Sequence, residues 1–331
     1  MEIDKSLWYN NSNMRVSLKA ICGKGVMNKK EFWYPSADGV TRIHAIKWEP
    51  EGSPVGIIQI AHGMVEYIDR YDRFAFFLTE NGYIVTGNDH LGHGESVTDK
   101  EKWGYFADND GTRFMLEDML YLTKLMKEEY GKLPCYLFGH SMGSFLTRRY
   151  LCHYGDELQG VVICGTGQLT IPVLIFGKCL VSVIAAFRGW KYRSSFANQL
   201  AFGGMNKAFM PARTKCDWLS RDEKEVDTYL GEERCSFIFT VNGYYNTFCN
   251  MLTIQKKSML NKMPKELPVL FIAGGDDPVG ASGKGVQKVV RSFQEIGMKD
   301  VKCIIYPEYR HEILNEIGRE QVYEDVLDWL S

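Results

Sequence analysis

The sequence predicts an α/β protein in which helices flank a mostly parallel sheet and a helical cap is inserted into this core. Short apolar segments bounded by turn residues predict buried strands at 55–63, 83–92, 133–141, 158–167, 267–275 and 300–307. Segments of helical character follow most of these strands, at 70–81, 112–130, 142–154, 283–297 and the end of the chain. Strands that alternate with helices favour a parallel sheet covered on both faces.

Two segments depart from this alternation. Residues 29–50 predict a hairpin whose turn contains Asp38-Gly39, and this hairpin would add antiparallel strands to the sheet. Between about 168 and 263 the strand and helix alternation stops, and the composition shifts to aromatic and basic residues. The expected organisation is an N-terminal extension over 1–30, an α/β core over 31–167 and 264–331, and a helical cap over 168–263.

Composition limits the classes of function. The 39 Lys and Arg residues nearly balance the 41 Asp and Glu residues, so no strong field would attract the chain to nucleic acid. Nine cysteines without CxxC pairs suggest a reducing compartment. The opening residues carry early acidic charge without a following apolar run, so we expect no signal peptide and a cytoplasmic protein. The apolar segment 171–187 contains Lys178 and is shorter than the roughly 20 residues of a membrane span, and it is a candidate for lipid contact.

A serine between two glycines is the strongest chemical signal. "CYLFGHSMGSFL" places Ser141 after an apolar strand and before a predicted helix, with Gly139 and Gly143 two residues away on either side. A sharp strand-to-helix turn would lift the hydroxyl out of the sheet, and small residues at these positions let the backbones approach. The same turn would aim the Met142 N–H at an anion forming beside the serine. The alternative is an ordinary glycine turn.

A serine nucleophile requires a histidine base and an acid that orients the histidine. His311 follows the last predicted strand, which places it at the carboxyl edge of the sheet where the site of a parallel sheet lies. The loop after the preceding strand supplies Asp276 and Asp277. We favour Asp277 because it immediately precedes Pro278, whereas Asp276 suits a turn residue that bonds its own backbone.

A second oxyanion donor is expected from the loop after the 55–63 strand. The Met64 N–H follows His62-Gly63 there and could face the Met142 N–H across the site. His62 would be structural, and Glu66 could either hydrogen-bond within the loop or be solvated.

Five sequence blocks together resemble the monoacylglycerol lipase and lysophospholipase branch of the α/β-hydrolases, whose domain is also named after a serine aminopeptidase. They are "HGMVEY" (62–67), "DHLGHGES" (89–96), "GHSMGS" (139–144), "GDDPVG" (275–280) and "YRHEILNE" (309–316). The resemblance implies an α/β-hydrolase fold, a Ser141, Asp277 and His311 triad, and oxyanion amides at Met64 and Met142. The glycerol lipases tend to carry glycine where this chain has Val65 and Ser144.

The predicted function is hydrolysis of carboxylic esters of single-chain acyl lipids through an acyl-enzyme, as in a lysophospholipase or monoacylglycerol lipase. The cap would bury the acyl chain and could touch a membrane surface transiently. Candidate chain-binding residues are Ile171, Leu174, Phe176, Trp190 and Phe202. The alternatives are a short-chain carboxylesterase or peptidase of the same family, and a non-catalytic protein that binds an apolar ligand. No cofactor or metal is expected, because "HEILN" lacks the second histidine of a zinc-binding HExxH.

Overall fold

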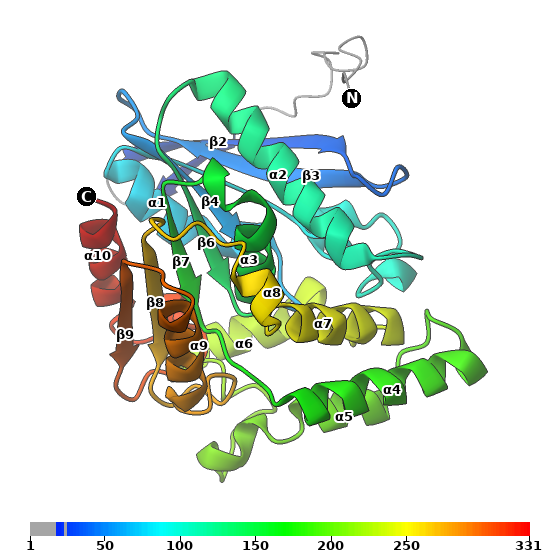
Figure 1. Ribbon diagram of the computed structural model, residues 1–331. Coiled ribbons are helices and arrows are strands. Elements are labelled where there is room, and N and C mark those ends of the chain that lie inside the picture. Colours follow the sequence, from blue (N-terminus) through cyan, green and yellow to red (C-terminus); the bar gives the residue numbers. More distant parts are fainter. Residues whose placement is uncertain (1–17, 23–24) are drawn as a thin grey trace.

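The computed structural model describes residues 18–22 and 25–331, and the rest of the expected N-terminal extension lies outside the described residues. One sheet runs through the protein in the strand order β1-β2-β3-β5-β4-β6-β7-β8-β9 (Figure 1). The strands are β1 (Leu18–Cys22), β2 (Gly25–Pro35), β3 (Arg42–Glu49), β4 (Gly56–Ala61), β5 (Tyr83–Asn88), β6 (Cys135–His140), β7 (Gly160–Cys164), β8 (Val269–Gly274) and β9 (Val301–Tyr306).

The sheet has two parts with different strand directions. The pairs β1–β2, β2–β3 and β3–β5 are antiparallel, and every pair from β5 to β9 is parallel. The predicted hairpin is formed by β2 and β3, which lie on the antiparallel side. The strand order reverses at β4, so the carboxyl ends of β4 and β6 border a crevice where parallel sheets usually bind ligands.

Helices cover both faces of the parallel part. They are α1 (Asp72–Glu80), α2 (Gly111–Tyr130), α3 (Met142–Tyr154), α9 (Lys284–Glu295) and α10 (Arg319–Leu330). One core cluster joins α2, α3 and α9 to one face of the sheet, and the other joins α1 and α10 to the opposite face. Successive residues of β4 divide between the clusters, Ile57 in the first and Ile58 in the second, because strand side chains alternate. The central strands β4 and β5 are therefore buried along their whole length and consist mostly of apolar residues.

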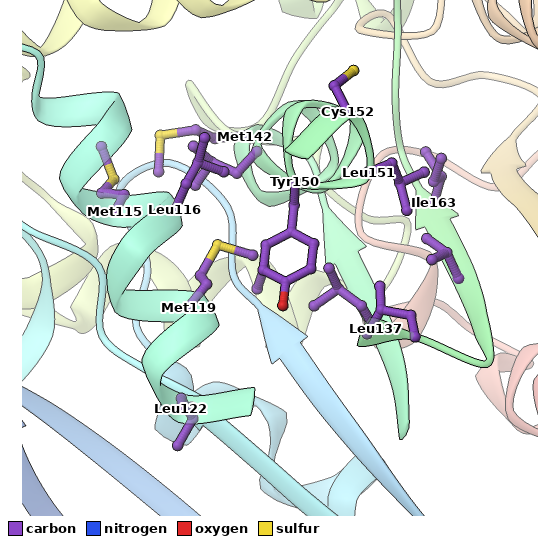
Figure 2. Packing of buried hydrophobic residues seen from close by; sticks show 14 of the residues in the cluster. Met115, Leu116, Met119, Leu122, Leu137, Met142, Tyr150, Leu151, Cys152 and Ile163 are labelled. Carbon is purple, nitrogen blue, oxygen red and sulfur yellow. The ribbon is translucent and has the colours of Figure 1, made fainter. Parts of the chain in front are cut away.

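The first cluster fixes the helix that follows Ser141. In Figure 2, Tyr150 of α3 points towards Leu137 of β6, with Met119 of α2 beside it. The buried Tyr150 hydroxyl lies 3.0 Å from the Thr123 hydroxyl of α2, so the polar tip of the ring is satisfied. This packing holds α3 rigidly against α2 and β6, which sets the position of the turn between β6 and α3.

The cap is a helical insertion between β7 and β8. It contains α4 (Ile171–Arg188), α5 (Ser195–Phe202), α6 (Glu223–Gly231), α7 (Val241–Thr253) and α8 (Lys257–Leu260). The longest cap helix, α4, lies along α7 (Figure 1). Gly177 permits this approach, because a Cβ there would lie 3.0 Å from the Phe248 ring of α7.

Candidate active site

Ser141 forms the sharp turn between β6 and α3. Its φ of 52° and ψ of −116° lie in a region that favours glycine, so the turn is strained. A Cβ on Gly143 would lie 2.0 Å from the Ala61 carbonyl oxygen of β4, and a Cβ on Gly139 would lie 2.2 Å from the Thr147 hydroxyl of α3. A side chain at either glycine would clash, because the neighbouring segments approach the backbone closely at both positions. This confirms the explanation that the sequence suggested for the two glycines.

The structure brings together the serine, histidine and aspartate that the sequence singled out. His311 follows β9, and its Nε2 atom lies 2.8 Å from Ser141 Oγ. Its Nδ1 atom lies 3.0 Å from Asp277 Oδ1 in the loop after β8, although the N–H is not aligned as in a linear hydrogen bond. Asp277 is fully buried and also accepts a 2.8 Å hydrogen bond from the Val279 amide. Asp276 is exposed, so of the two neighbouring aspartates only Asp277 contacts the histidine.

The loop after β4 lies directly against Ser141. A Cβ on Gly63 would lie 3.1 Å from the Ser141 Cβ, and Met64 lines the same cavity as the serine. Met142 is the first residue of α3, where helix N–H groups lack intrahelical acceptors. His62 is buried and structural in its contacts, because Nδ1 bonds the Gly63 carbonyl at 2.8 Å and Nε2 accepts from the His90 amide at 2.9 Å.

Val65 and Ser144 stand where the glycerol lipases tend to carry glycine, and they differ in backbone strain. Val65 adopts a φ of 57°, which is strained for a β-branched residue, and its carbonyl accepts a 3.1 Å hydrogen bond from the Tyr229 hydroxyl of α6. Ser144 is buried without strain, and its hydroxyl donates a 2.6 Å hydrogen bond to the Ser141 carbonyl. The cap thus holds the strained loop in place through Tyr229.

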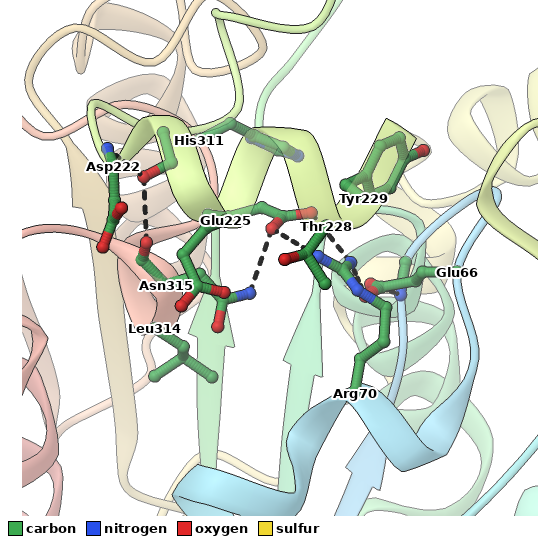
Figure 3. A network of polar contacts seen from close by, with 12 residues as sticks. Glu66, Arg70, Asp222, Glu225, Thr228, Tyr229, His311, Leu314 and Asn315 are labelled. Atoms are coloured by element: carbon green, nitrogen blue, oxygen red, sulfur yellow. Dashed lines mark hydrogen bonds and ion pairs between the residues drawn. The ribbon is translucent and has the colours of Figure 1, made fainter. Parts of the chain in front are cut away.

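A buried network of charges is centred on Arg70 and Glu66 (Figure 3). Of the two alternatives for Glu66, the structure shows hydrogen bonding within the loop rather than solvation, whereas the sequence did not predict the roles of Arg70 and Glu312. Arg70 donates at 2.8 Å to Glu66, and at 2.9 and 2.8 Å to the two carboxylate oxygens of Glu312. Glu66 also accepts from His140 Nδ1 at 3.1 Å and from the Gly63 amide. Since Glu66 follows Met64, His140 precedes Ser141 and Glu312 follows His311, the network joins all three loops of the site.

The network keeps its members charged. Burial alone would raise the pKa of both Glu66 and Glu312. His140 and Arg70 nevertheless hold the pKa of Glu66 below its ordinary 4.5. Arg70 does the same for Glu312. Burial alone would lower the pKa of His140, but Glu66 and Glu312 raise it above 6.5. The His140 ring lies 4.9 Å from the His311 ring, so the raised pKa favours the protonated form of an imidazole next to the histidine that contacts Ser141.

A cavity of about 420 Å³ opens over Ser141 and His311 between the core and the cap. Of the five cap residues that the sequence suggested for chain binding, Phe202 lines this cavity. Other residues that line the cavity belong to the aromatic-rich segment 168–263 but were not predicted individually. They include Trp218, Tyr229, Phe237 and Ile238. The Trp218 ring lies 5.1 Å from the His311 ring, and its carbonyl accepts from the His311 amide at 3.3 Å.

The other four suggested cap residues do not line this cavity, which corrects that prediction. Leu174 is fully buried between α4 and the core, where it packs with Phe145. Ile171, Phe176 and Trp190 are 50%, 61% and 41% exposed on the outer surface of the cap. For Ile171 and Phe176 the reason is that α4 packs one face on α7 and turns the rest of its apolar surface outwards. Trp190 follows α4 and lies with its ring 5.1 Å from the Tyr245 ring of α7.

Within residues 18–22 and 25–331, no three His, Cys, Asp or Glu side chains lie together in an arrangement that could hold a metal ion. His90 and His93, which lie close to His62, are buried and pack through their rings.

Comparison with known proteins agrees with this geometry. Residues 52–318 match the family described as serine aminopeptidase, S33. The chain belongs to this S33 family of serine hydrolases. The S33 match covers β4 to β9 and the cap, so it includes Ser141, Asp277 and His311.

Individual relatives of this S33 hydrolase cover most of its length. The chain is 24% identical to the monoacylglycerol lipase of Mycolicibacterium smegmatis over 91% of this chain and 97% of that protein. It is 27% identical to the human monoglyceride lipase over 86% of this chain and 85% of that protein. A thermostable carboxyl esterase from Bacillus coagulans, solved in complex with glycerol, matches with a TM-score of 0.85 and 30% identity, covering 91% of this chain and 97% of the esterase. These matches establish an α/β-hydrolase fold.

Proposed function

We propose that this S33 hydrolase cleaves carboxylic esters of single-chain acyl lipids through a covalent acyl-enzyme. The observation that carries the proposal is the 2.8 Å contact between His311 Nε2 and Ser141 Oγ beneath a cavity lined largely by apolar side chains. The named lipases and esterase among its relatives support the same reaction class.

The mechanism follows from the positions of the three side chains. Ser141 Oγ attacks the ester carbonyl while His311 Nε2 takes its proton, and Asp277 holds Nδ1 protonated so that Nε2 is free to act as the base. The amides of Met64 and Met142 stabilise the oxyanion. His311 then protonates the leaving alcohol and activates the water that releases the fatty acid.

The cavity suits an acyl chain better than a peptide. Phe202, Trp218 and Phe237 offer apolar contact, and each buried methylene contributes about 0.8 kcal/mol to binding. A peptidase that binds a free amine needs an unpaired carboxylate, whereas Glu66 and Glu312 are both paired with Arg70. The kcat/KM for ester hydrolysis should therefore rise as the acyl chain of the substrate becomes longer.

Hydrolysis of p-nitrophenyl esters with acyl chains of two to about sixteen carbons tests the proposal, with fluorophosphonate labelling of wild type and Ser141→Ala in parallel. We expect labelling of wild type only and an optimum of kcat/KM at medium or long chains. Preference for acetyl esters would favour the short-chain carboxylesterase. An unlabelled wild-type serine, together with binding of apolar ligands, would favour a non-catalytic binding protein.

We also propose that the cap docks transiently on a lipid surface. By length and composition α4 could cross a membrane. Only 22% of it is buried, so most of its apolar surface is free to contact lipid, while Leu174 and Val181 on its inner face pack into the protein. Its outer face and that of α5 expose large apolar side chains, namely Ile171, Val173, Ile175, Phe176, Val183, Phe187, Phe196 and Leu200. A lipid surface is the partner that fits, because α5 also contributes Asn198 and Phe202 to the cavity, so a single-chain lipid leaving that surface would enter beside the site.

Flotation with phosphatidylcholine vesicles tests this docking. The double variant Phe176→Asp and Phe187→Asp should float less with vesicles and should lose activity on emulsified esters, while activity on a soluble short ester is retained. Val40→Asp is the matched control, because Val40 is 88% exposed on the β2–β3 hairpin and lies outside the cap. Equal flotation of wild type and the double variant would contradict docking through α4.

A further inference from the structure

The charges around the cavity do not cancel evenly. Two of its lining residues, Glu66 and Glu312, are carboxylates whose charge is taken up by Arg70 and, for Glu66, also by His140. The remaining fixed charge in the lining is Lys215, which is exposed and forms no ion pair within 4.0 Å among the residues that the structure describes. The wall of the cavity therefore presents one cationic side chain without a direct ion-pair partner.

The loop that carries Lys215 is held in a defined position. The Asp217 carboxylate accepts a 3.1 Å hydrogen bond from the Thr214 amide and a further bond from the Thr214 hydroxyl, so it is occupied within the loop. Asn206 donates at 2.7 Å to the Thr214 carbonyl and accepts at 2.8 Å from the Trp218 amide. Since Trp218 contacts His311, the same rigid segment fixes Lys215 relative to the proposed base.

A neutral polar group lies on the same cavity. Asn198 of α5 accepts a 2.8 Å hydrogen bond from the Tyr244 hydroxyl through Oδ1, which directs its amide N–H groups away from that partner. An ammonium together with amide donors suits the oxygens of a phosphate group, which are strong acceptors that carry negative charge. The hydroxyls of a neutral glycerol head group would leave the ammonium without a counter-charge.

We infer that Lys215 selects substrates whose leaving alcohol carries a phosphate, so that the preferred lipid is a single-chain acyl glycerophosphate rather than a neutral monoacylglycerol. The inference rests on the proposed esterase function and adds the chemical class of the head group. The ester is cleaved by the same acyl transfer from the leaving alcohol to Ser141 and then to water, and the phosphate stays on the released alcohol.

The test compares kcat/KM for two substrates with the same acyl chain, 1-acylglycerol and 1-acylglycerol 3-phosphate, below their aggregation concentrations. Wild type should prefer the phosphate substrate, and Lys215→Met should reduce the ratio of the two kcat/KM values by about fivefold, the size expected for one partly exposed charge pair. Lys215→Arg should restore the preference, and added salt should weaken it in wild type. Lys207→Met is the matched control, because Lys207 is an exposed cap lysine that does not line the cavity.

The outcomes separate this inference from the function on which it rests. Hydrolysis of both lipids with a ratio that Lys215→Met leaves unchanged would overturn the head-group assignment and leave the esterase proposal standing. Hydrolysis of neither lipid by wild type would overturn both. A fall in the ratio with Lys207→Met equal to that with Lys215→Met would also overturn the assignment, because it would indicate general surface charge.

Discussion

Ser141 adopts a backbone conformation that most residues other than glycine avoid, and the surrounding packing holds it there. Its φ of 52° leads directly into α3, whose buried face is fixed against β6 and α2. Gly139 and Gly143 have no room for a side chain. The strain is therefore a property of the turn that presents the hydroxyl and is supported by the rest of the fold.

Two substitutions of Ser141 test its role as the nucleophile and its backbone strain separately. Ser141→Ala and Ser141→Gly should both lower kcat for ester hydrolysis by at least about 10³-fold, because each removes the proposed nucleophile. Ser141→Gly should be more stable than Ser141→Ala by about 1 kcal/mol, because glycine adopts a positive φ at little cost. Thermal unfolding measures the difference. An alanine variant as stable as the glycine variant would show that the turn is not strained.

The two adjacent aspartates offer a matched pair of variants. Asp277 is buried against His311, whereas Asp276 is exposed. Asp277→Asn should reduce kcat by about 10⁴-fold, because an amide does not stabilise the required histidine tautomer, as in other serine triads. Asp276→Asn should retain most of the activity. Steady-state kinetics on one ester decides the assignment, and a larger loss in Asp276→Asn would reverse it.

At the scale of elements, the network centred on Arg70 ties together loops that are far apart in sequence. Arg70, near the start of α1, pairs with Glu66 after β4 and with Glu312 after β9. Its guanidinium also lies 4.9 Å from the Tyr229 ring of α6 in the cap. One buried side chain therefore supports the oxyanion loop, the histidine loop and the cap.

Removal of this cation should destabilise the protein in a pH-dependent manner. Arg70→Met leaves the buried Glu312 carboxylate without a cationic partner and removes one of the two basic side chains beside Glu66, which should cost about 3–5 kcal/mol at pH 7. In wild type the depressed pKa values of Glu66 and Glu312 give stability that is present above their ordinary pKa near 4.5 and is lost as the pH falls through the folded-state values. The difference between wild type and variant should thus be largest at neutral pH and should shrink as the pH falls below about 4.5 towards the folded-state pKa values.

Urea unfolding at several pH values measures this difference. Arg113→Met is the control, because Arg113 pairs with Asp110 and Glu117 on the surface and should cost less than about 1 kcal/mol. A constant difference between wild type and Arg70→Met across this pH range would contradict the role given to the buried carboxylates.

At the scale of the whole molecule, the sequence correctly predicted the features that depend on local residue patterns or on the order of the strands. Apolar runs predicted β4 to β9, and the position of His311 after the last strand brought it to the serine. The lining of the cap was not predictable in the same way, because α4 is apolar on nearly every face and only its packing on α7 decides which side chains are buried. For Glu66 the sequence offered a hydrogen bond within its loop as one of two alternatives, but it did not predict the pairing with Arg70 and Glu312, because these residues are far apart in sequence.

The cap and core together enclose a cavity that holds Ser141, and the cap exposes the apolar faces of α4 and α5 on its outer surface. The most direct test is release of fatty acid from a pure single-chain acyl lipid by wild type and by Ser141→Ala, measured side by side at equal folded concentration. The account predicts steady release by wild type and none above background by Ser141→Ala. Equal release by both proteins, or none by wild type from any single-chain lipid, would contradict it.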